Sequence, residues 1–291
     1  AATIRAIRHG RRPGPDTSRI ELAFAVDDRL RTRLPVVLQS IIEHTSAPMH
    51  AHILARGLDD EFAAALERDF GAAMDLAFYD FSSVDYGAGL RMLSHTTVST
   101  LDRLLLPELL PELDKILYLD ADLVVKADLA ELWMIDLKGR RIAAKSSSSP
   151  GARYVYQMVQ HALSNLPPSR ACDARRNLYD RYPMLCRAFN AGVLLMNLAR
   201  MRDENFARRV IPMVENYGMN DQDVLNVYAA ADRVELDAAW NAIPRQDLTD
   251  GAKIVHFAGP VKPWSELYIG GASDFRACES RYLARTGRAS G

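Results

Sequence analysis

The stretch Ile116-Leu117-Tyr118-Leu119-Asp120-Ala121-Asp122 decides both the fold and the site of this chain. Its apolar part predicts a buried strand, which ends in two carboxylates separated by one alanine. Because side chains alternate along a strand, Asp120 and Asp122 point to the same side if the strand continues through them. Two carboxylates at such short range repel each other. A divalent cation shared with the phosphates of a nucleotide would remove that repulsion.

Alternating strands and helices precede this stretch. Apolar runs predict strands over 21–26, 50–55 and 74–79, and the spacing of apolar residues predicts helices over 34–43 and 59–70. This order implies an α/β fold with a parallel sheet and right-handed crossovers. Ligands of such sheets bind outside the carboxyl ends of the strands, which is where Asp120 and Asp122 are expected.

The remaining residues predict further elements, with one interruption. We expect helices over 97–106, 129–133, 206–217 and 224–231, and strands over 141–144, 189–197 and 253–257, the last a core strand. The region 145–188 is rich in serine, proline and arginine and interrupts the alternation of predicted strands and helices, although 154–163 has helical spacing. Residues 1–19 predict a flexible N-terminal arm, and 20–291 predict a single domain.

Composition restricts the class of protein. The chain has 291 residues, of which 48% are hydrophobic and 25% are charged, and its formal net charge is -1. These values are typical of a soluble globular protein and give no reason to expect nucleic-acid binding. The spacing of the three cysteines matches no zinc motif, so we expect a reducing cytoplasm. We expect no membrane span and find no signal-peptide core at the N-terminus.

His256 is the candidate third partner of the two aspartates. It ends the predicted strand at 253–257 and precedes the turn Gly259-Pro260. A single histidine is more often a structural residue than a ligand. Together with Asp120 and Asp122, however, it completes a mixed oxygen and nitrogen set, which favours manganese over magnesium.

Further polar residues occur within or next to predicted apolar elements, where a purely structural role does not explain all of them. Asn220-Asp221-Gln222-Asp223 opens a predicted helix, and capping explains only one of these four residues. Asn190 lies inside an apolar strand, where a polar side chain needs a partner. Lys262 lies between two prolines and can meet a diphosphate. Arg103 alone reads as a solvated residue on a leucine-rich helix.

A second interpretation of Asp120 remains open. Asp-x-Asp-x-Val also resembles the nucleophile strand of haloacid-dehalogenase-type phosphatases, in which the first aspartate is phosphorylated. In those enzymes the motif stands near the start of the domain, whereas three predicted strands precede it here.

Six blocks of sequence together resemble glycosyltransferase family 8, the retaining α-glycosyltransferases that include lipopolysaccharide galactosyl- and glucosyltransferases and glycogenin. They occur in the family's order between about residues 20 and 264, interrupted by 145–188. The blocks are Phe24–Asp28, Asp102–Leu104, Leu117–Asp122, Phe189–Val193, Asp221–Asn226 and His256–Trp264. The resemblance implies a GT-A fold, in which a single Rossmann-like, mostly parallel sheet is flanked by helices.

The resemblance also implies a UDP-hexose donor and a Mn²⁺ ion, with Mg²⁺ as the alternative. It assigns the metal to Asp120, Asp122 and His256, and UDP contacts to Ala25 and Asp27 (uracil), to Ala121, and to Gly259 and Lys262 (diphosphate). The donor sugar is assigned to Arg103, Asn190, Asp221 and Gln222. Two positions depart from the family pattern: Arg29 stands where asparagine is common, and Asp102 where tyrosine is common.

The expected reaction is transfer of galactose or glucose to a saccharide or glycolipid hydroxyl, with retained configuration. The catalytic candidates are Gln222, which would stabilise a cationic sugar during front-face attack, Asp223, which is the reserve nucleophile, and Asp221. We expect 145–188 to form an acceptor-side insertion or lid. The expected location is the cytoplasm, with peripheral association at the inner face of a membrane. A nucleotide-sugar binding protein without activity is the remaining alternative.

Overall fold

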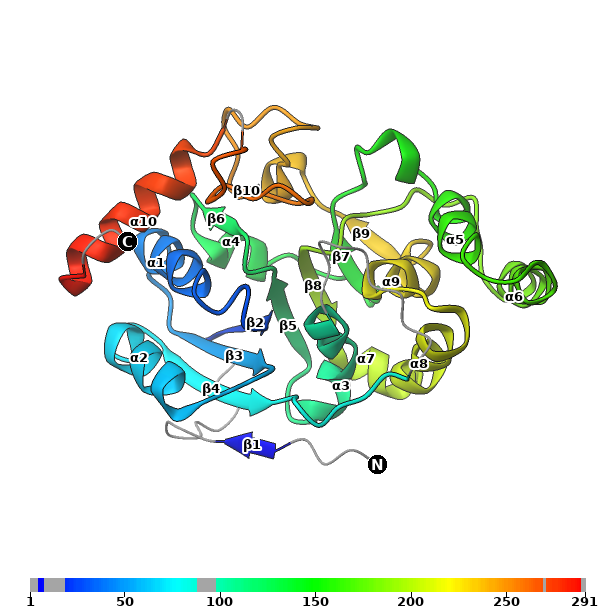
Figure 1. Ribbon diagram of the computed structural model, residues 1–291, viewed down its shortest axis with the longest axis horizontal. Coiled ribbons are helices and arrows are strands. Elements are labelled where there is room, and N and C mark those ends of the chain that lie inside the picture. Colours follow the sequence, from blue (N-terminus) through cyan, green and yellow to red (C-terminus); the bar gives the residue numbers. More distant parts are fainter. Residues whose placement is uncertain (1–4, 8–18, 88–97, 269–270, 289–291) are drawn as a thin grey trace.

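A central eight-stranded sheet organises the molecule (Figure 1). The computed structural model describes residues 5–7, 19–87, 98–268 and 271–288. β1 and β8 run antiparallel to their neighbours, and the other strands of the sheet share one direction. The mostly parallel α/β sheet is therefore confirmed. In spatial order the strands are β1 (Arg5–Ile7), β4 (Asp75–Asp80), β3 (Met49–Ala55), β2 (Ile20–Val26), β5 (Lys115–Leu119), β8 (Val193–Asn197), β7 (Ile142–Ala144) and β9 (Arg233–Glu235).

Helices cover both faces of this sheet. Along β5, Leu117 and Leu119 belong to one core and Ile116 and Tyr118 to the other, because strand side chains alternate. The Leu117 face is covered by α1 (Leu34–His44), α2 (Asp60–Phe70) and α4 (Leu129–Trp133). The Tyr118 face is covered by η1 (Val98–Leu105), α3 (Leu106–Leu109), α5 (Val155–Leu163), α6 (Pro168–Arg181), α7 (Leu198–Asp203), α8 (Phe206–Tyr217) and α9 (Asp221–Ala229).

Local chemistry explains where the predicted helices begin. Pro35 occupies the first turn of α1, where its missing N–H costs no hydrogen bond. The Asp59 carboxylate accepts a hydrogen bond from the Phe62 N–H (2.7 Å) and caps α2, whose first turn also carries acidic residues.

A separate two-stranded sheet brings His256 to the end of β5. It pairs β6 (Leu123–Val125) antiparallel with β10 (Ile254–His256), with His256 opposite Leu123. The predicted core strand at 253–257 is thus a strand, but it lies outside the main sheet. This sheet contacts η3 (Ala238–Asn241) and α10 (Ser273–Thr286), the last of which also contacts α1. The short η2 (Pro150–Ala152) contacts α5.

Some boundaries differ from the sequence-based prediction. The helix expected over 97–106 is a 3₁₀ segment followed by the short α3, and residue 97 lies outside the described residues. The strand expected over 189–197 begins only at Val193, after a turn. Within the predicted arm over 1–19, Arg5–Ile7 pairs with β4 as an edge strand, and Arg19 is buried. The predicted helix over 154–163 is confirmed as α5.

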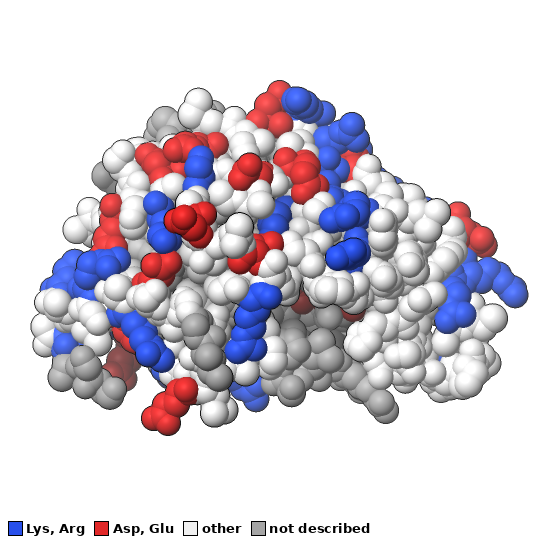
Figure 2. All heavy atoms as spheres, turned by 90° about the horizontal axis from the view of Figure 1, so that it is seen from above, with Lys and Arg blue, Asp and Glu red and all other residues white. Residues whose placement is uncertain are grey.

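Charge on the surface is mixed. On the face drawn in Figure 2, lysine and arginine side chains are interspersed with aspartate and glutamate side chains. This mixture agrees with the formal net charge of -1. Among the described residues, no helix combines the length and the apolar character needed to cross a bilayer.

Candidate active site

A cavity of about 420 Å³ lies at the carboxyl ends of β2 and β5. Segments far apart in the sequence line it: the end of β2, the turn after β5, the turn before β8, the start of α9 and the loop after β10. This is the location expected for a ligand in an open α/β sheet. Most of the predicted site residues meet here, namely Ala25, Arg103, Asp120, Ala121, Asp122, Asn190, Asp221, Gln222, His256, Gly259 and Lys262.

Three of these groups face one point. His256 Nε2 lies 3.2 Å from Asp122 Oδ1 and 3.5 Å from Asp120 Oδ2. One ligand atom from each residue lies within 4.8 Å of the others, close enough to share a metal ion. The strand ends at Leu119, so a turn rather than a continuing strand brings the two aspartates together.

In each of the three side chains, the polar atom that does not face the shared point is bound by a neighbouring side chain. Arg103 Nη2 (2.9 Å) and the Tyr118 hydroxyl (3.0 Å) donate to Asp120 Oδ1. Lys262 Nζ donates to Asp122 Oδ2. These contacts orient the carboxylates and leave Asp120 Oδ2 and Asp122 Oδ1 directed at the shared point.

His256 is oriented in the same way. Its Nδ1 lies 2.9 Å from Asn241 Oδ1, and Asn241 Nδ2 donates to Asn190 Oδ1 (3.0 Å). With the amide oxygen as acceptor, Nδ1 carries the proton, and the Nε2 lone pair faces the two aspartates. An imidazole whose outer nitrogen is fixed by a hydrogen bond is typical of metal ligands.

The surroundings of Asp122 show whether a divalent cation fits the point that the three groups share. Asp122 Oδ1 is buried and has no hydrogen-bond partner, which is costly for a carboxylate oxygen. Burial alone would raise the pKa of Asp122, but the Lys262 ammonium beside it outweighs burial and lowers the pKa well below its usual range. Two carboxylate oxygens and one imidazole nitrogen converge on one point, so the residues fit a divalent cation.

Arg103 is a buried cation, not the solvated residue that the helix pattern alone suggested. Only 2% of it is exposed, and its guanidinium lies 3.9 Å from the centre of the Tyr118 ring. It joins Asp120 to Asp221, whose Oδ2 lies 3.3 Å away. Burial by itself would lower the pKa of Arg103, but its aromatic and acidic neighbours raise it above the usual value. One permanent charge thus supports both acids.

Asp102, the departure from the family pattern next to Arg103, serves the fold behind the cavity. It is fully buried, and its carboxylate accepts hydrogen bonds from Arg56 (2.9 and 2.7 Å) and from the Tyr86 hydroxyl (3.0 Å). Burial raises the pKa of Asp102 to about 6 even though Arg56 opposes the shift. Asp102 is therefore a support for the η1 segment.

Gln222 belongs to a chain of amides that ends at His256. Its Oε1 accepts from the Ala191 N–H (3.0 Å) and from Asn190 Nδ2 (3.2 Å). Both lone pairs of this oxygen are then engaged. The part of Gln222 left to meet a ligand in the cavity is its Nε2 amide group.

Two predicted site residues turn away from the cavity. Asp27 accepts hydrogen bonds from the backbone N–H groups of Arg29 (3.0 Å) and Leu30 (3.3 Å), and these two neighbours line the cavity in its place. Asp223 accepts from the Asn220 N–H (3.2 Å) in a reciprocal cap of α9. Burial raises the pKa of Asp223 to about 7. A buried carboxyl that is engaged in a helix cap and only partly ionised near pH 7 is poorly suited to act as a nucleophile.

Glycines permit the close approaches in this site. A Cβ at Gly192 would lie 2.1 Å from His256 Cε1 and 2.8 Å from Asp120 Oδ2, so any side chain there collides with two of the three converging groups. Gly259 has a φ of +109°, which side chains other than glycine rarely adopt. It forms part of the cavity wall before Lys262.

Sequence reasoning missed several partners of the site. Tyr118 was assigned only to the strand, although its position two residues before Asp120 places both side chains on one face. Thr100, whose hydroxyl donates to Asp221 (2.7 Å), and Asn241 carry no local signal. They reach the site through tertiary packing alone.

The model of the family "Glycosyl transferase family 8" matches residues 21–267. The chain belongs to that family. The membership decides against the phosphatase interpretation of Asp120.

Individual relatives are distant. The chain is 27% identical to glycosyltransferase GlyF of Streptococcus pneumoniae over 54% of its own length and 36% of the relative's. It is 25% identical to lipopolysaccharide 1,2-glucosyltransferase of Escherichia coli K12 over 54% and 46%. The chain thus spans less than half the length of these two curated relatives.

A solved structure shares the fold over almost the whole chain. The galactosyltransferase LgtC, in complex with donor and acceptor sugar analogs, has a TM-score of 0.70 and 24% identity, covering 90% of this chain and 96% of LgtC. The GT-A fold is therefore confirmed.

Replacement of Gly192 tests the convergence of the three groups. We expect Gly192→Ala to weaken Mn²⁺ binding by about 10- to 100-fold, the loss typical of a displaced metal ligand, because the new methyl group displaces the His256 ring. Titration calorimetry measures the affinity. Gly151→Ala is the matched control, since nothing lies within 4 Å of a Cβ there. Equal Mn²⁺ affinity in both variants would contradict the site.

Burial of Asp223 predicts a pH dependence of stability. The unfolded chain loses this proton near pH 4, whereas the folded protein retains it until about pH 7. The folded state then binds more protons between these values, so its stability falls as the pH rises. From pH 5 to pH 8 we expect wild type to lose about 2–3 kcal/mol more of its free energy of unfolding than Asp223→Asn loses. Urea titrations with EDTA measure this, and parallel profiles would refute the burial effect.

Proposed function

We propose that this protein is a retaining glycosyltransferase that transfers a hexose, galactose or glucose, from a UDP-sugar to a hydroxyl of a saccharide or glycolipid. One observation carries the proposal: the carboxylates of Asp120 and Asp122 converge with His256 at the end of β5, and Asp122 Oδ1 has no hydrogen-bond partner. Family membership supports the transferase class.

The same residues suggest how the donor is held. Asp120, Asp122 and His256 would bind Mn²⁺, with Mg²⁺ as the weaker alternative, and this ion supplies Lewis-acid chemistry to the departing diphosphate. Lys262 and the backbone at Gly259 would bind the phosphates. Lys262 now pairs with Asp122, so a phosphate can take over its charge without large movement.

The other lining residues divide between uracil and sugar. Ala25, at the end of β2, lies on the side assigned to uracil, together with Arg29 and Leu30. Asp27 would shape that turn through the backbone and not through direct contact. Arg103, Asn190, Asp221 and Gln222 would surround the hexose, and Ala121, which also lines the cavity, would contact the diphosphate.

Retention of configuration needs either a covalent intermediate or front-face attack. Asp223 is buried and capped, and Gln222 is neutral, so neither is a suitable nucleophile. We therefore favour front-face attack, in which a phosphate oxygen of UDP accepts the proton of the acceptor hydroxyl. Gln222 would position the sugar through its Nε2 amide rather than stabilise a cation, because its oxygen is already engaged.

The proposed acceptor is a class of molecule, namely saccharides and glycolipids. The relatives include a lipopolysaccharide glucosyltransferase and a galactosyltransferase, which supports a saccharide or glycolipid acceptor and a hexose donor. The region 145–188, which includes α5 and α6, would form the acceptor side or a lid. The exposed Arg175 and Arg176 of α6 suit an anionic acceptor at the cytoplasmic face of a membrane.

A donor panel tests the proposal without knowledge of the acceptor. The protein is incubated with UDP-galactose, UDP-glucose and other UDP-sugars, with Mn²⁺ or with EDTA, and released UDP is measured. We expect Mn²⁺-dependent release from a hexose donor through slow transfer to water. Asp122→Asn should lower the rate at least about 100-fold, because the proposed metal ion at the diphosphate would lose a charged ligand.

Asp250→Asn is the matched control, since Asp250 is exposed and lies outside the cavity lining. Its rate should equal that of wild type. Gln222→Ala should reduce the rate, and undiminished turnover would remove Gln222 from the reaction. Tight UDP binding without release from any donor would favour the inactive binding protein.

A further inference from the structure

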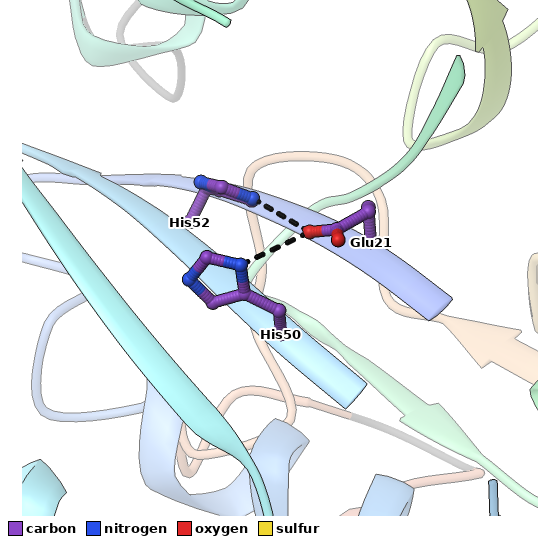
Figure 3. Close-up of side chains that lie close together, drawn as sticks. All are labelled: Glu21, His50 and His52. Carbon is purple, nitrogen blue, oxygen red and sulfur yellow. Dashed lines mark hydrogen bonds and ion pairs between the residues drawn. The ribbon is translucent and has the colours of Figure 1, made fainter. Parts of the chain in front are cut away.

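A second group of metal-ligating side chains lies at the opposite end of β2. Glu21 of β2 and His50 and His52 of β3 point toward one another (Figure 3), and their ligand atoms lie within 4.8 Å of one another. Glu21 and Ala25 are four residues apart in one strand, so about 13 Å of extended chain separates this cluster from the cavity. None of the three residues lines the cavity.

The sheet itself creates this cluster. Glu21 pairs directly with His50 across the parallel β2–β3 ladder. His50 and His52 are two residues apart in β3, so both side chains project from the same face. Glu21 Oε2 lies 2.8 Å from His52 Nε2 and 3.1 Å from His50 Nδ1. One carboxylate oxygen and two imidazole nitrogens therefore meet above adjacent strands.

Outer contacts orient these ligands as they do in the cavity. Arg19 donates two hydrogen bonds to Glu21 Oε1 (2.9 and 2.7 Å), which leaves Oε2 for the histidines. The Tyr79 hydroxyl lies 3.1 Å from His52 Nδ1. A tyrosine hydroxyl can accept from this nitrogen, which frees the lone pair of His52 Nε2 for a metal.

One atom of the cluster lacks a partner. His50 Nδ1 is buried and has no hydrogen bond, although it lies 3.1 Å from Glu21 Oε2. The two atoms form an ion pair without hydrogen-bond geometry, so a cation bound to both would satisfy the buried nitrogen. The His50 side chain as a whole is 12% exposed, which gives an ion a route to the cluster.

The fixed charges beside the cluster partly cancel. Arg19 opposes a cation, but Asp75, 3.4 Å from Arg19, offsets part of that charge.

We propose that Glu21, His50 and His52 form a zinc site that joins β2 to β3 at the amino end of the sheet. Two imidazoles and one carboxylate, with water in the fourth position, are a ligand set known from catalytic zinc sites. Here the three ligands lie outside the cavity, so the zinc would serve the fold: by binding the folded state alone, it would stabilise the β2–β3 pair on which the cavity is built.

Zinc stoichiometry tests this site on the full chain. Protein freed of metal is dialysed against Zn²⁺ and analysed by mass spectrometry of the metal. We expect His50→Asn to bind one zinc fewer than wild type. The same difference of one is expected in the Asp122→Asn background, which separates this site from the cavity. His161→Asn is the matched control, because His161 is exposed and outside both clusters, and it should bind as many ions as wild type.

Thermal stability gives an independent measurement. Zn²⁺ should raise the Tm of Asp122→Asn but not that of the double variant with His50→Asn. Tyr79→Phe retains all three ligands and should weaken this zinc about 10- to 100-fold, which keeps the test valid if His50→Asn unfolds. If the His50 variants bind as much zinc as their parent proteins and show the same rise of Tm with Zn²⁺, the site is overturned. Equal losses in His161→Asn would show surface binding alone.

Discussion

Electrostatic repulsion among Asp120, Asp122 and the His256 nitrogen is the constraint on which the candidate active site depends. All three groups direct an electron pair at one point, and their outer atoms are fixed by Arg103, Tyr118, Lys262 and Asn241. A protein that only needed stability would turn these groups apart. Here the fold holds them together, at the cost of a buried oxygen without a partner.

The fold supplies the geometry through three separate features. β5 ends at Leu119 and delivers the aspartates, β6 and β10 pair so that His256 adjoins Asp122, and Gly192 leaves room for the imidazole. A change in any one of them displaces a ligand. The Glu21, His50 and His52 cluster repeats this logic, with Arg19 and Tyr79 as the outer contacts.

Periodicity and local chemistry predicted the parallel half of the sheet and the position of the carboxylates, because strands and helices there follow regular apolar spacing. They could not predict β6, β9 or the separate sheet, since short strands depend on tertiary pairing. The cavity-lining set was largely anticipated through the family resemblance. Asp27 and Asp223 bind backbone N–H groups and are not in the cavity lining, which the sequence could not show because capping uses the same residue types as ligand binding. Asn241 reaches His256 only through the folded chain.

The most direct measurement is the anomalous scattering of manganese in a crystal grown with UDP and Mn²⁺. Our account predicts a single strong manganese peak in the cavity, bonded to Asp120 Oδ2, Asp122 Oδ1 and His256 Nε2. A manganese peak that leaves His256 uncoordinated, or UDP bound in the cavity without any manganese, would contradict it.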